Sequence, residues 1–209
     1  MENNESLRDL PTEERYKIFA DFCKKSYCPI SRPKTAELLK AYANTYKPKN
    51  ILEIGTAIGY SGAVMLDSCE GTLTTIEKSE DMCNLATKHF GVLGLSERVD
   101  LINGDAGEVL QNLLNQKKKF DMVFLDGPKS QYIKYFELID KMLNKGGVLI
   151  ADDVLFFGAV MDETKVTQKN KTIVKNLKLF LHEIKSNPNY ESEIFDIEDG
   201  ISISIKKKD

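Results

Sequence analysis

The chain has 209 residues, enough for one domain with a substantial core, and its 42% hydrophobic and 29% charged residues are ordinary for a globular protein. A formal net charge of −3 argues against a wholly basic nucleic-acid-binding protein and leaves a local basic patch open. We expect no membrane span, secretory signal or zinc cluster, because no apolar stretch is long enough, the N-terminus is polar and the four cysteines lack C-x-x-C spacing. Reduced thiols in a cytoplasmic protein are the expectation.

The first predicted element is an amphipathic helix at residues 35–46, within an N-terminal helical extension (residues 1–48) of a single domain covering residues 1–209. From residue 50 onward, short apolar runs alternate with longer helical patterns. We expect strands at residues 50–54, 72–77, 98–102, 121–125 and 148–151, and helices from residues 60 and 79 and at residues 106–115 and 130–143. This alternation predicts an α/β fold, in which helices cover both faces of a parallel sheet and the ligand site lies at the carboxyl ends of the strands.

The last quarter of the chain is predicted to leave this pattern. A turn is expected at Lys145–Gly147, before the fifth strand. A polar stretch at residues 162–172 precedes a helix at residues 173–184 and two strands at residues 192–197 and 201–205. Asp199-Gly200 between these strands is a hairpin signal, so we expect an antiparallel pair to end the sheet.

A glycine-containing turn follows the first strand, in Glu53-Ile-Gly55-Thr-Ala-Ile-Gly59-Tyr-Ser61. Glu77 ends the second strand, where an acid can accept hydrogen bonds from two ribose hydroxyls, and Asp105-Ala106 follows the third strand, where it can read an adenine edge. Ala57 takes the middle place of a G-x-G-x-x-G motif, which favours a nucleoside cofactor without phosphates over a dinucleotide. The alternative is that the glycines only form a tight turn.

Three carboxylates follow neighbouring strands of the predicted sheet. Asp126 comes after the fourth strand, and Asp152-Asp153 after the fifth. Like charges brought together in a partly buried site repel one another, and a bound cation would relieve this repulsion. Oxygen ligands without His or Cys favour Mg²⁺, with Ca²⁺ or Mn²⁺ as alternatives. The other interpretation is that one aspartate caps a helix and another is solvated.

Lys129 lies three residues after Asp126. A lysine beside a divalent cation in a dry cleft would release its proton more easily, and could then act as a general base. Taken alone, a lysine in a loop is more commonly a solvated surface charge.

A basic stretch precedes the last helix. Residues 164–178 contain no acid and five lysines, namely Lys165, Lys169, Lys171, Lys175 and Lys178. Such a run is usually a solvated helix face, and it can also neutralise the phosphates of a nucleic acid. We assign His89 and His182 to structure, and the aromatic residues Tyr132, Tyr135 and Phe136 to the core.

Together, residues 53–61, Leu125-Asp-Gly-Pro-Lys129, Gln131-Tyr132 and Ala151-Asp-Asp153 resemble the class I, cation-dependent O-methyltransferases, which include catechol and caffeoyl-CoA O-methyltransferases. The resemblance runs from about Ile30 to the C-terminus. Residues 152–158, the basic stretch and residues 194–205 are similar to the bacterial branch that methylates 5-hydroxyuridine at the wobble position of tRNA. The sequence departs from this pattern in two places: Asp153 stands where the family usually has Asn, and the pair Gly127-Pro128 differs from the bacterial branch.

The resemblance implies a Rossmann-like sheet of seven strands, mostly parallel, with an antiparallel C-terminal strand. It implies S-adenosylmethionine as methyl donor, Mg²⁺, and a homodimer. The implied donor-binding residues are Glu53, Gly55, Thr56, Gly59, Tyr60, Ser61, Glu77, Asp105, Ala106 and Asp126. The implied metal ligands are Asp126, Asp152 and Asp153, and Asp126 and Lys129 are the implied catalytic residues, with Lys129 as the base.

Three hypotheses follow for the function. The first is methylation of the 5-hydroxyl of 5-hydroxyuridine in tRNA, with tRNA bound through Lys165, Lys169, Lys171 and Lys175. The second keeps this chemistry and takes a small catechol-like phenol or an acyl-CoA ester as acceptor. The third is a module that binds an adenosine ligand without catalysis, in which the carboxylates merely cap helices.

Overall fold

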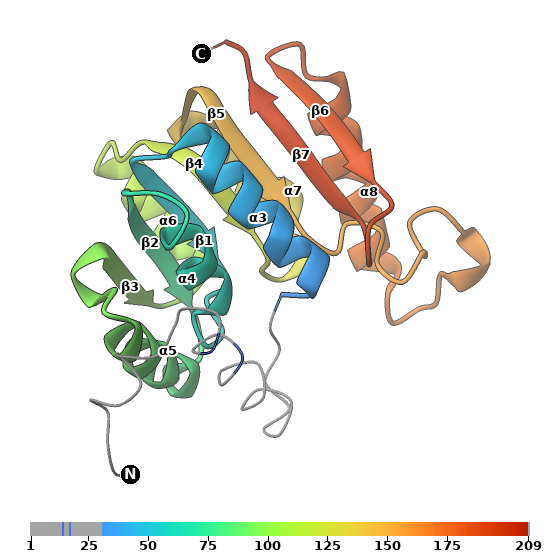
Figure 1. The fold of residues 1–209 in the computed structure, drawn as a ribbon. Coiled ribbons are helices and arrows are strands. Elements are labelled where there is room, and N and C mark those ends of the chain that lie inside the picture. The colour runs from blue at the N-terminus through green and yellow to red at the C-terminus, as the bar shows by residue number, and fades with distance from the viewer. Residues whose placement is uncertain (1–13, 15–16, 18–30, 209) are drawn as a thin grey trace.

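The computed structural model describes residues 14, 17 and 31–208, so most of the predicted N-terminal extension lies outside the described residues. A seven-stranded sheet in the order β3-β2-β1-β4-β5-β7-β6 forms the centre of the molecule (Figure 1). The strands are β1 (Asn50–Ile54), β2 (Thr72–Glu77), β3 (Val99–Asn103), β4 (Phe120–Leu125), β5 (Leu143–Ala151), β6 (Tyr190–Phe195) and β7 (Ile201–Lys206). Strands β1 to β5 pair in parallel, and β7 runs antiparallel to both of its neighbours, β5 and β6. The predicted mostly parallel sheet with an antiparallel C-terminal strand is therefore confirmed.

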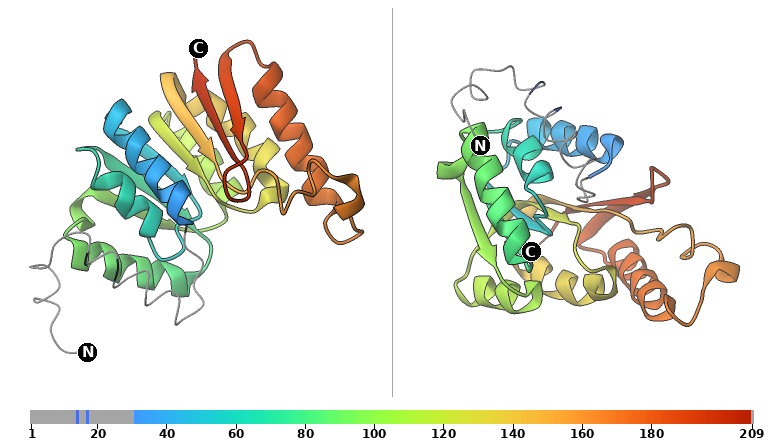
Figure 2. Two further views of the ribbon diagram at one scale, coloured as in Figure 1. Left: turned by 45° about the vertical axis from the view of Figure 1, so that its right-hand side comes forward. Right: turned by 90° about the horizontal axis from the view of Figure 1, so that it is seen from below.

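Helices cover both faces of the sheet (Figure 2). One face carries α3 (Pro33–Tyr46), α4 (Tyr60–Leu66) and α5 (Glu80–Leu93), and the other carries α6 (Ala106–Asn115), α7 (Tyr132–Met142) and α8 (Lys171–Ser186). Successive residues of a strand point to opposite faces, so Met122 and Phe124 of β4 join the first helical layer while Val123 and Leu125 join the second. This two-sided burial explains why β4 is a continuous apolar run in the sequence.

The predicted turn at Lys145–Gly147 is wrong, because these residues lie inside β5. The register between β4 and β5 shifts between Phe120 and Met122, and Gly146 there has a φ of +78°, which glycine adopts without strain. The chain therefore bends within the strand instead of leaving it. The other predicted strands and helices are present, with ends displaced by a few residues.

The turn between β6 and β7 holds two distant parts of the chain. Glu198 accepts hydrogen bonds from the backbone N–H groups of Lys34 and Thr35, at 3.1 and 3.2 Å, and so caps the start of α3. Asp199 accepts a hydrogen bond from the N–H of Phe157, in the segment that follows β5. The C-terminal hairpin thus fixes both α3 and the start of the projecting segment at residues 152–170, which contains the short helix η3 (Glu163–Lys165) (Figure 1).

Among the described residues, every helix is too short or too polar to span a bilayer.

Candidate functional site

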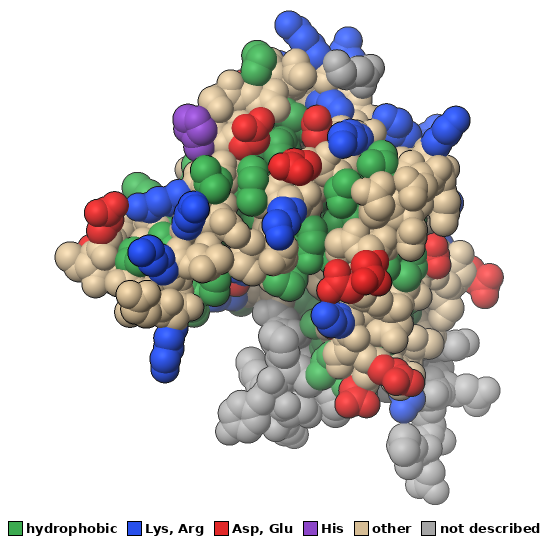
Figure 3. All heavy atoms as spheres, turned by 180° about the vertical axis from the view of Figure 1, so that it is seen from behind, with side chains coloured by type: hydrophobic (Ala, Val, Ile, Leu, Met, Phe, Trp, Pro, Cys, Tyr) green, Lys and Arg blue, Asp and Glu red, His purple; other side chains and the backbone are tan. Residues whose placement is uncertain are grey.

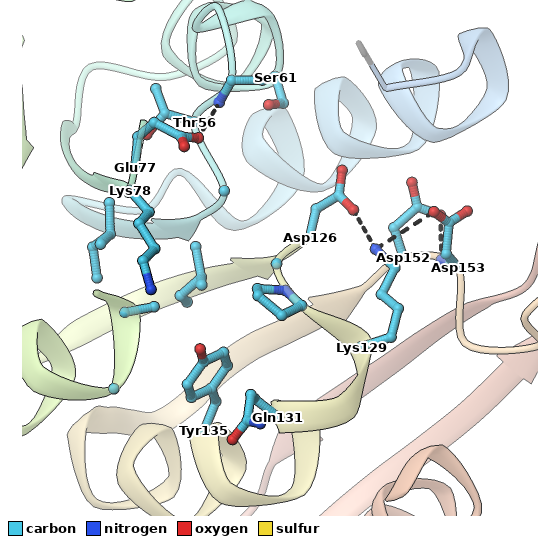
Figure 4. A pocket seen from close by; sticks show the side chains of 18 of the residues that line it. Thr56, Ser61, Glu77, Lys78, Asp126, Lys129, Gln131, Tyr135, Asp152 and Asp153 are labelled. Carbon is cyan, nitrogen blue, oxygen red and sulfur yellow. Dashed lines mark hydrogen bonds and ion pairs between the residues drawn. The ribbon is translucent and has the colours of Figure 1, made fainter. Parts of the chain in front are cut away.

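A cavity of about 1140 Å³ opens at the carboxyl ends of the parallel strands. The loops after β1, β2, β3, β4 and β5 all contribute to its wall (Figure 4). Of the predicted site residues, the lining includes Gly55, Thr56, Tyr60, Ser61, Glu77, Asp105, Ala106, Asp126, Lys129, Asp152 and Asp153. Residues that the sequence placed more than 90 positions apart therefore share one cavity.

The glycine turn after β1 depends on the absence of side chains. Gly55 has a φ of +100°, and a Cβ atom there would lie 2.4 Å from the carbonyl oxygen of Asp126. Gly59 has a φ of +84°, and a Cβ atom there would lie 2.7 Å from the ring of Phe90. The glycines are thus required both by the backbone conformation and by close packing, and Gly55 brings the β1 loop against the β4 loop that carries Asp126.

Glu53 lies beneath this turn and is not among the residues that line the cavity, which differs from its predicted contact with the donor. Its fully buried carboxyl group accepts hydrogen bonds from the hydroxyls of Ser61, at 2.5 Å, and Thr75, at 2.6 Å. Burial raises the pKa of Glu53 to about 7, against the opposing effect of these two hydrogen bonds. Glu53 therefore acts on the cavity indirectly, because it holds Ser61 in the cavity wall.

Two acidic side chains lie on one side of the cavity. Glu77 accepts hydrogen bonds from the N–H groups of Ala57, at 2.9 Å, and Ser79, at 2.8 Å. Asp105 caps α6 through the N–H of Gly107, at 3.0 Å, and the hydrogen bond from Lys78, at 3.1 Å, lowers its pKa. Both carboxylates are held in place by the backbone and retain acceptor capacity toward the cavity.

The second group of acids lies on the other side, around Lys129 (Figure 4). The ammonium group of Lys129 is 2.6 Å from Asp126 and 3.4 Å from Asp153. Burial and the neighbouring charges of Asp126 and Asp153 raise the pKa of Asp152 to about 6, and burial also raises that of Asp126. Burial disfavours the charged form of Lys129, but the neighbouring Tyr132, Asp126 and Asp153 side chains together outweigh this effect and raise its pKa.

The chemistry of this second group suits a hard cation. Asp126, Asp152 and Asp153 supply only oxygen ligands, and their mutual repulsion is visible in the raised pKa of Asp152. In the structure, the ammonium group of Lys129 lies between Asp126 and Asp153. Among the described residues, no three Asp, Glu, His or Cys side chains lie close enough together to coordinate one metal ion. Binding of a cation by these carboxylates would require that the Lys129 ammonium move away from Asp126 and Asp153.

Two residues of this region make contacts that the sequence analysis did not predict. Tyr132 was assigned to the core, and it is fully buried, but its hydroxyl also lies 3.0 Å from the carbonyl oxygens of Leu125 and Asp152, so it links the ends of β4 and β5. Arg32 forms an ion pair of 2.8 Å with Asp153. The position of Tyr132, one helical turn after Lys129, could have predicted that it lies near this group. Arg32 precedes a proline that begins a helix and belongs to no recognisable motif, so no sequence pattern indicated its ion pair.

The predicted tRNA-binding lysines lie outside this cavity. Lys165 is in η3, Lys169 is in the loop that follows, and Lys171 and Lys175 are in the first turns of α8. All four side chains are exposed. Their position neither requires nor excludes a nucleic-acid partner.

Several solved structures that are similar to this chain are described as O-methyltransferases. The structure of an O-methyltransferase from Bacillus cereus in complex with SAH has 26% identity to this chain and a TM-score of 0.85, and the match covers 95% of this chain and 93% of that chain. A structure from Staphylococcus aureus, provisionally described as a caffeoyl-CoA O-methyltransferase, has 33% identity and a TM-score of 0.84, with 98% and 99% of the two chains covered.

A catechol O-methyltransferase from Niastella koreensis is 33% identical over 134 residues, which are 63% of this chain and 61% of that protein. The chain spans about three fifths of the length of the first two curated relatives that it matches. A family model described as O-methyltransferase matches residues 13–207. This match extends over nearly the whole chain and includes every residue of the cavity, and the protein is accordingly a member of the O-methyltransferase family.

Proposed function

We propose that this protein transfers the methyl group of S-adenosylmethionine to a hydroxyl whose neighbouring carbon also carries an oxygen, in a reaction that requires Mg²⁺. One observation carries the proposal: a single cavity has nucleoside-type acceptors, Glu77 and Asp105, on one side and the Asp126–Lys129–Asp153 group on the other. A site for the donor and a site for the acceptor oxygens would thus face each other.

On the donor side, Glu77 would accept hydrogen bonds from the ribose hydroxyls, and Asp105-Ala106 would contact the adenine; both line the cavity, which supports these roles. Thr56, Tyr60 and Ser61 line the turn between them and the acidic group. The SAH complex of the Bacillus cereus relative supports this assignment.

On the acceptor side, Asp126, Asp152 and Asp153 would hold the Mg²⁺, with Mn²⁺ or Ca²⁺ as alternatives. When bound, the ion supplies a positive charge that orients two adjacent oxygens and lowers the pKa of the hydroxyl. Lys129 accepts the hydroxyl proton at Nζ, and the resulting oxyanion attacks the methyl carbon as the carbon–sulfur bond breaks. Since Asp126 and Asp153 raise the pKa of Lys129, this role requires that a cation take over these two carboxylates. Most of the acceleration then comes from orientation.

For the acceptor we propose 5-hydroxyuridine at the wobble position of tRNA, which would become 5-methoxyuridine. Its 5-hydroxyl and 4-carbonyl oxygens are neighbours, and the exposed lysines at positions 165, 169, 171 and 175 offer phosphate contacts. The second candidate is a catechol-like phenol or an acyl-CoA ester, which the names of the Niastella koreensis and Staphylococcus aureus relatives favour. A homodimer remains part of the proposal, to be tested by light scattering of the purified protein.

The reaction is tested with purified protein, S-adenosylmethionine and Mg²⁺. Asp152→Ala should abolish turnover while calorimetry still detects donor binding, and the exposed Asp100→Ala should leave both unchanged. Full activity in EDTA would contradict the role of the metal. Donor binding by the wild type without metal binding or turnover would favour the non-catalytic module.

The acceptor is tested by mass analysis of tRNA nucleosides from cells that lack the protein. Loss of 5-methoxyuridine with accumulation of 5-hydroxyuridine supports tRNA. Unchanged nucleosides together with methylation of catechol by the purified protein would assign the small phenol instead.

A further inference from the structure

A second cavity, of about 500 Å³, lies between η3 and α8, outside the cavity already described. We call it the α8 groove and define it by its lining residues, which are Glu163, Val166, Lys171, Val174, Lys175, Lys178 and Leu179. None of these residues takes part in the donor or metal chemistry proposed above.

The charge of the α8 groove is opposite to that of the whole chain. Lys171, Lys175 and Lys178 recur at the spacing that places side chains on one face of a helix, and they extend over roughly 10 Å of α8. Only Lys178 has an acidic partner in the groove, Glu163 at 3.3 Å. Residues 163–178 contain five lysines and one acid in a chain with a net charge of −3. Figure 3 shows Lys and Arg side chains gathered on the projecting lobe at the left.

The same groove also offers apolar surface. Val174 is buried at its floor, Val166 is half-buried, and Leu179 is 47% exposed at its edge. The ammonium groups suit the phosphates of a nucleic-acid backbone, and the aliphatic carbon beside them offers apolar contact to its sugars. Hydrophobic atoms lie among the basic side chains of this lobe in Figure 3.

The helix that forms the groove also contacts the catalytic loop. Asn176 of α8 donates a hydrogen bond of 2.6 Å to the carbonyl of Ser130, the residue after Lys129. At 100° per residue, Asn176 lies about 140° around α8 from Lys171 and about 100° from Lys175, so it is on a different face of the helix. Helix α8 therefore carries the groove on one face and contacts the Lys129 loop from another.

We propose that the α8 groove binds the sugar–phosphate backbone of the RNA acceptor. This inference rests on the proposed RNA acceptor and assigns it a defined docking surface. It predicts that affinity for RNA depends on Lys171 and Lys175 more than on the other exposed lysines of the chain.

The test compares Lys171→Glu/Lys175→Glu with a control that changes the net charge equally, Lys118→Glu/Lys145→Glu, whose exposed residues lie near the amino-terminal ends of β4 and β5. The probe is a synthetic RNA hairpin that carries 5-hydroxyuridine in its loop. Fluorescence anisotropy over a range of salt should show at least about tenfold weaker binding for the groove variant and a salt slope smaller by roughly 0.7 for each lost phosphate contact. The control should remain within about twofold of the wild type. Donor affinity by calorimetry should match in all three proteins.

The outcomes separate the two proposals. If the wild type does not methylate the hairpin with S-adenosylmethionine and Mg²⁺, the RNA acceptor fails and the groove assignment fails with it. If the wild type methylates it and the groove variant binds as well as the control, only the groove assignment fails. If polyglutamate binds as tightly as RNA with the same dependence on Lys171 and Lys175, the groove is a site for acidic protein and the proposal is overturned. Lys171→Gln/Lys175→Gln replaces the charge reversal if that variant does not fold.

Discussion

Glu53→Gln removes a buried charge without removing the side chain's hydrogen-bonding capacity. Glu53 has no exposed surface, and burial raises its pKa from 4.5 to about 7. One pKa unit corresponds to about 1.4 kcal/mol, so this group makes the free energy of unfolding depend on pH by about 3 kcal/mol. The glutamine amide can still accept a hydrogen bond from Ser61 and can donate one toward Thr75.

The direction of this pH dependence follows from the number of protons bound by the folded and unfolded chains. Between pH 4.5 and about pH 7 the folded protein holds a proton that the unfolded chain has released. The stabilisation is therefore fully present below pH 4.5, falls as the pH rises through this interval, and is lost above about pH 7. Urea unfolding of the wild type and of Glu53→Gln at several pH values should show that the variant gains about 3 kcal/mol relative to the wild type from the acidic to the alkaline end.

A matched substitution of an exposed residue, Glu97→Gln, controls for a general effect of charge removal. Its stability difference from the wild type should change little over the same range. Parallel pH profiles of the wild type and Glu53→Gln would refute the reasoning, because they would mean that Glu53 titrates alike in the folded and unfolded chains.

Tyr132→Phe leaves the buried carbonyl of Asp152 without its hydroxyl partner, so urea unfolding should show that the free energy of unfolding falls by about 1–3 kcal/mol. Turnover should fall more than donor affinity. Unchanged stability would contradict the role of Tyr132 in linking β4 and β5. In Gly94→Ala the new methyl group meets open space, so the free energy of unfolding should fall by roughly 1–2 kcal/mol for the left-handed backbone alone. In Gly55→Ala the methyl group also clashes with the backbone of Asp126, so the loss of stability should be larger and calorimetry should detect no donor binding. Equal losses of stability in the two variants would contradict the close approach at Gly55. Lys129→Met should lose turnover by at least about a hundredfold with donor binding retained, and single-turnover rates near those of the wild type would remove its role as proton acceptor.

Much of the fold could be predicted because the sheet is buried on both faces. Parallel strands with this burial are continuous apolar runs, as in β4, and a tight turn after such a strand requires glycine, as at Gly55. Since parallel strands end at the same edge, the residues after them were expected to share a site, and Glu77, Asp126 and Asp152 do line one cavity.

The remaining features depend on contacts that sequence patterns do not encode. The bend in β5 results from register against β4, which no local signal reports. The ion pair of Arg32 with Asp153 joins residues 121 positions apart. Glu53 follows the motif's spacing, yet the pleat of β1 directs its side chain beneath the turn, toward Ser61, and away from the cavity.

The turn that follows β6 has a consequence for how the protein is made. Glu198 fixes the start of α3, and with it Arg32, while Asp199 fixes the segment that begins at Asp153. A nascent chain on the ribosome can pair β1 to β5 early, whereas the contacts of Glu198 and Asp199 form only after the turn between β6 and β7 has been made. Premature termination before Glu198 would yield a polypeptide that has β1 to β6 but lacks the contacts that hold the start of α3 and Phe157.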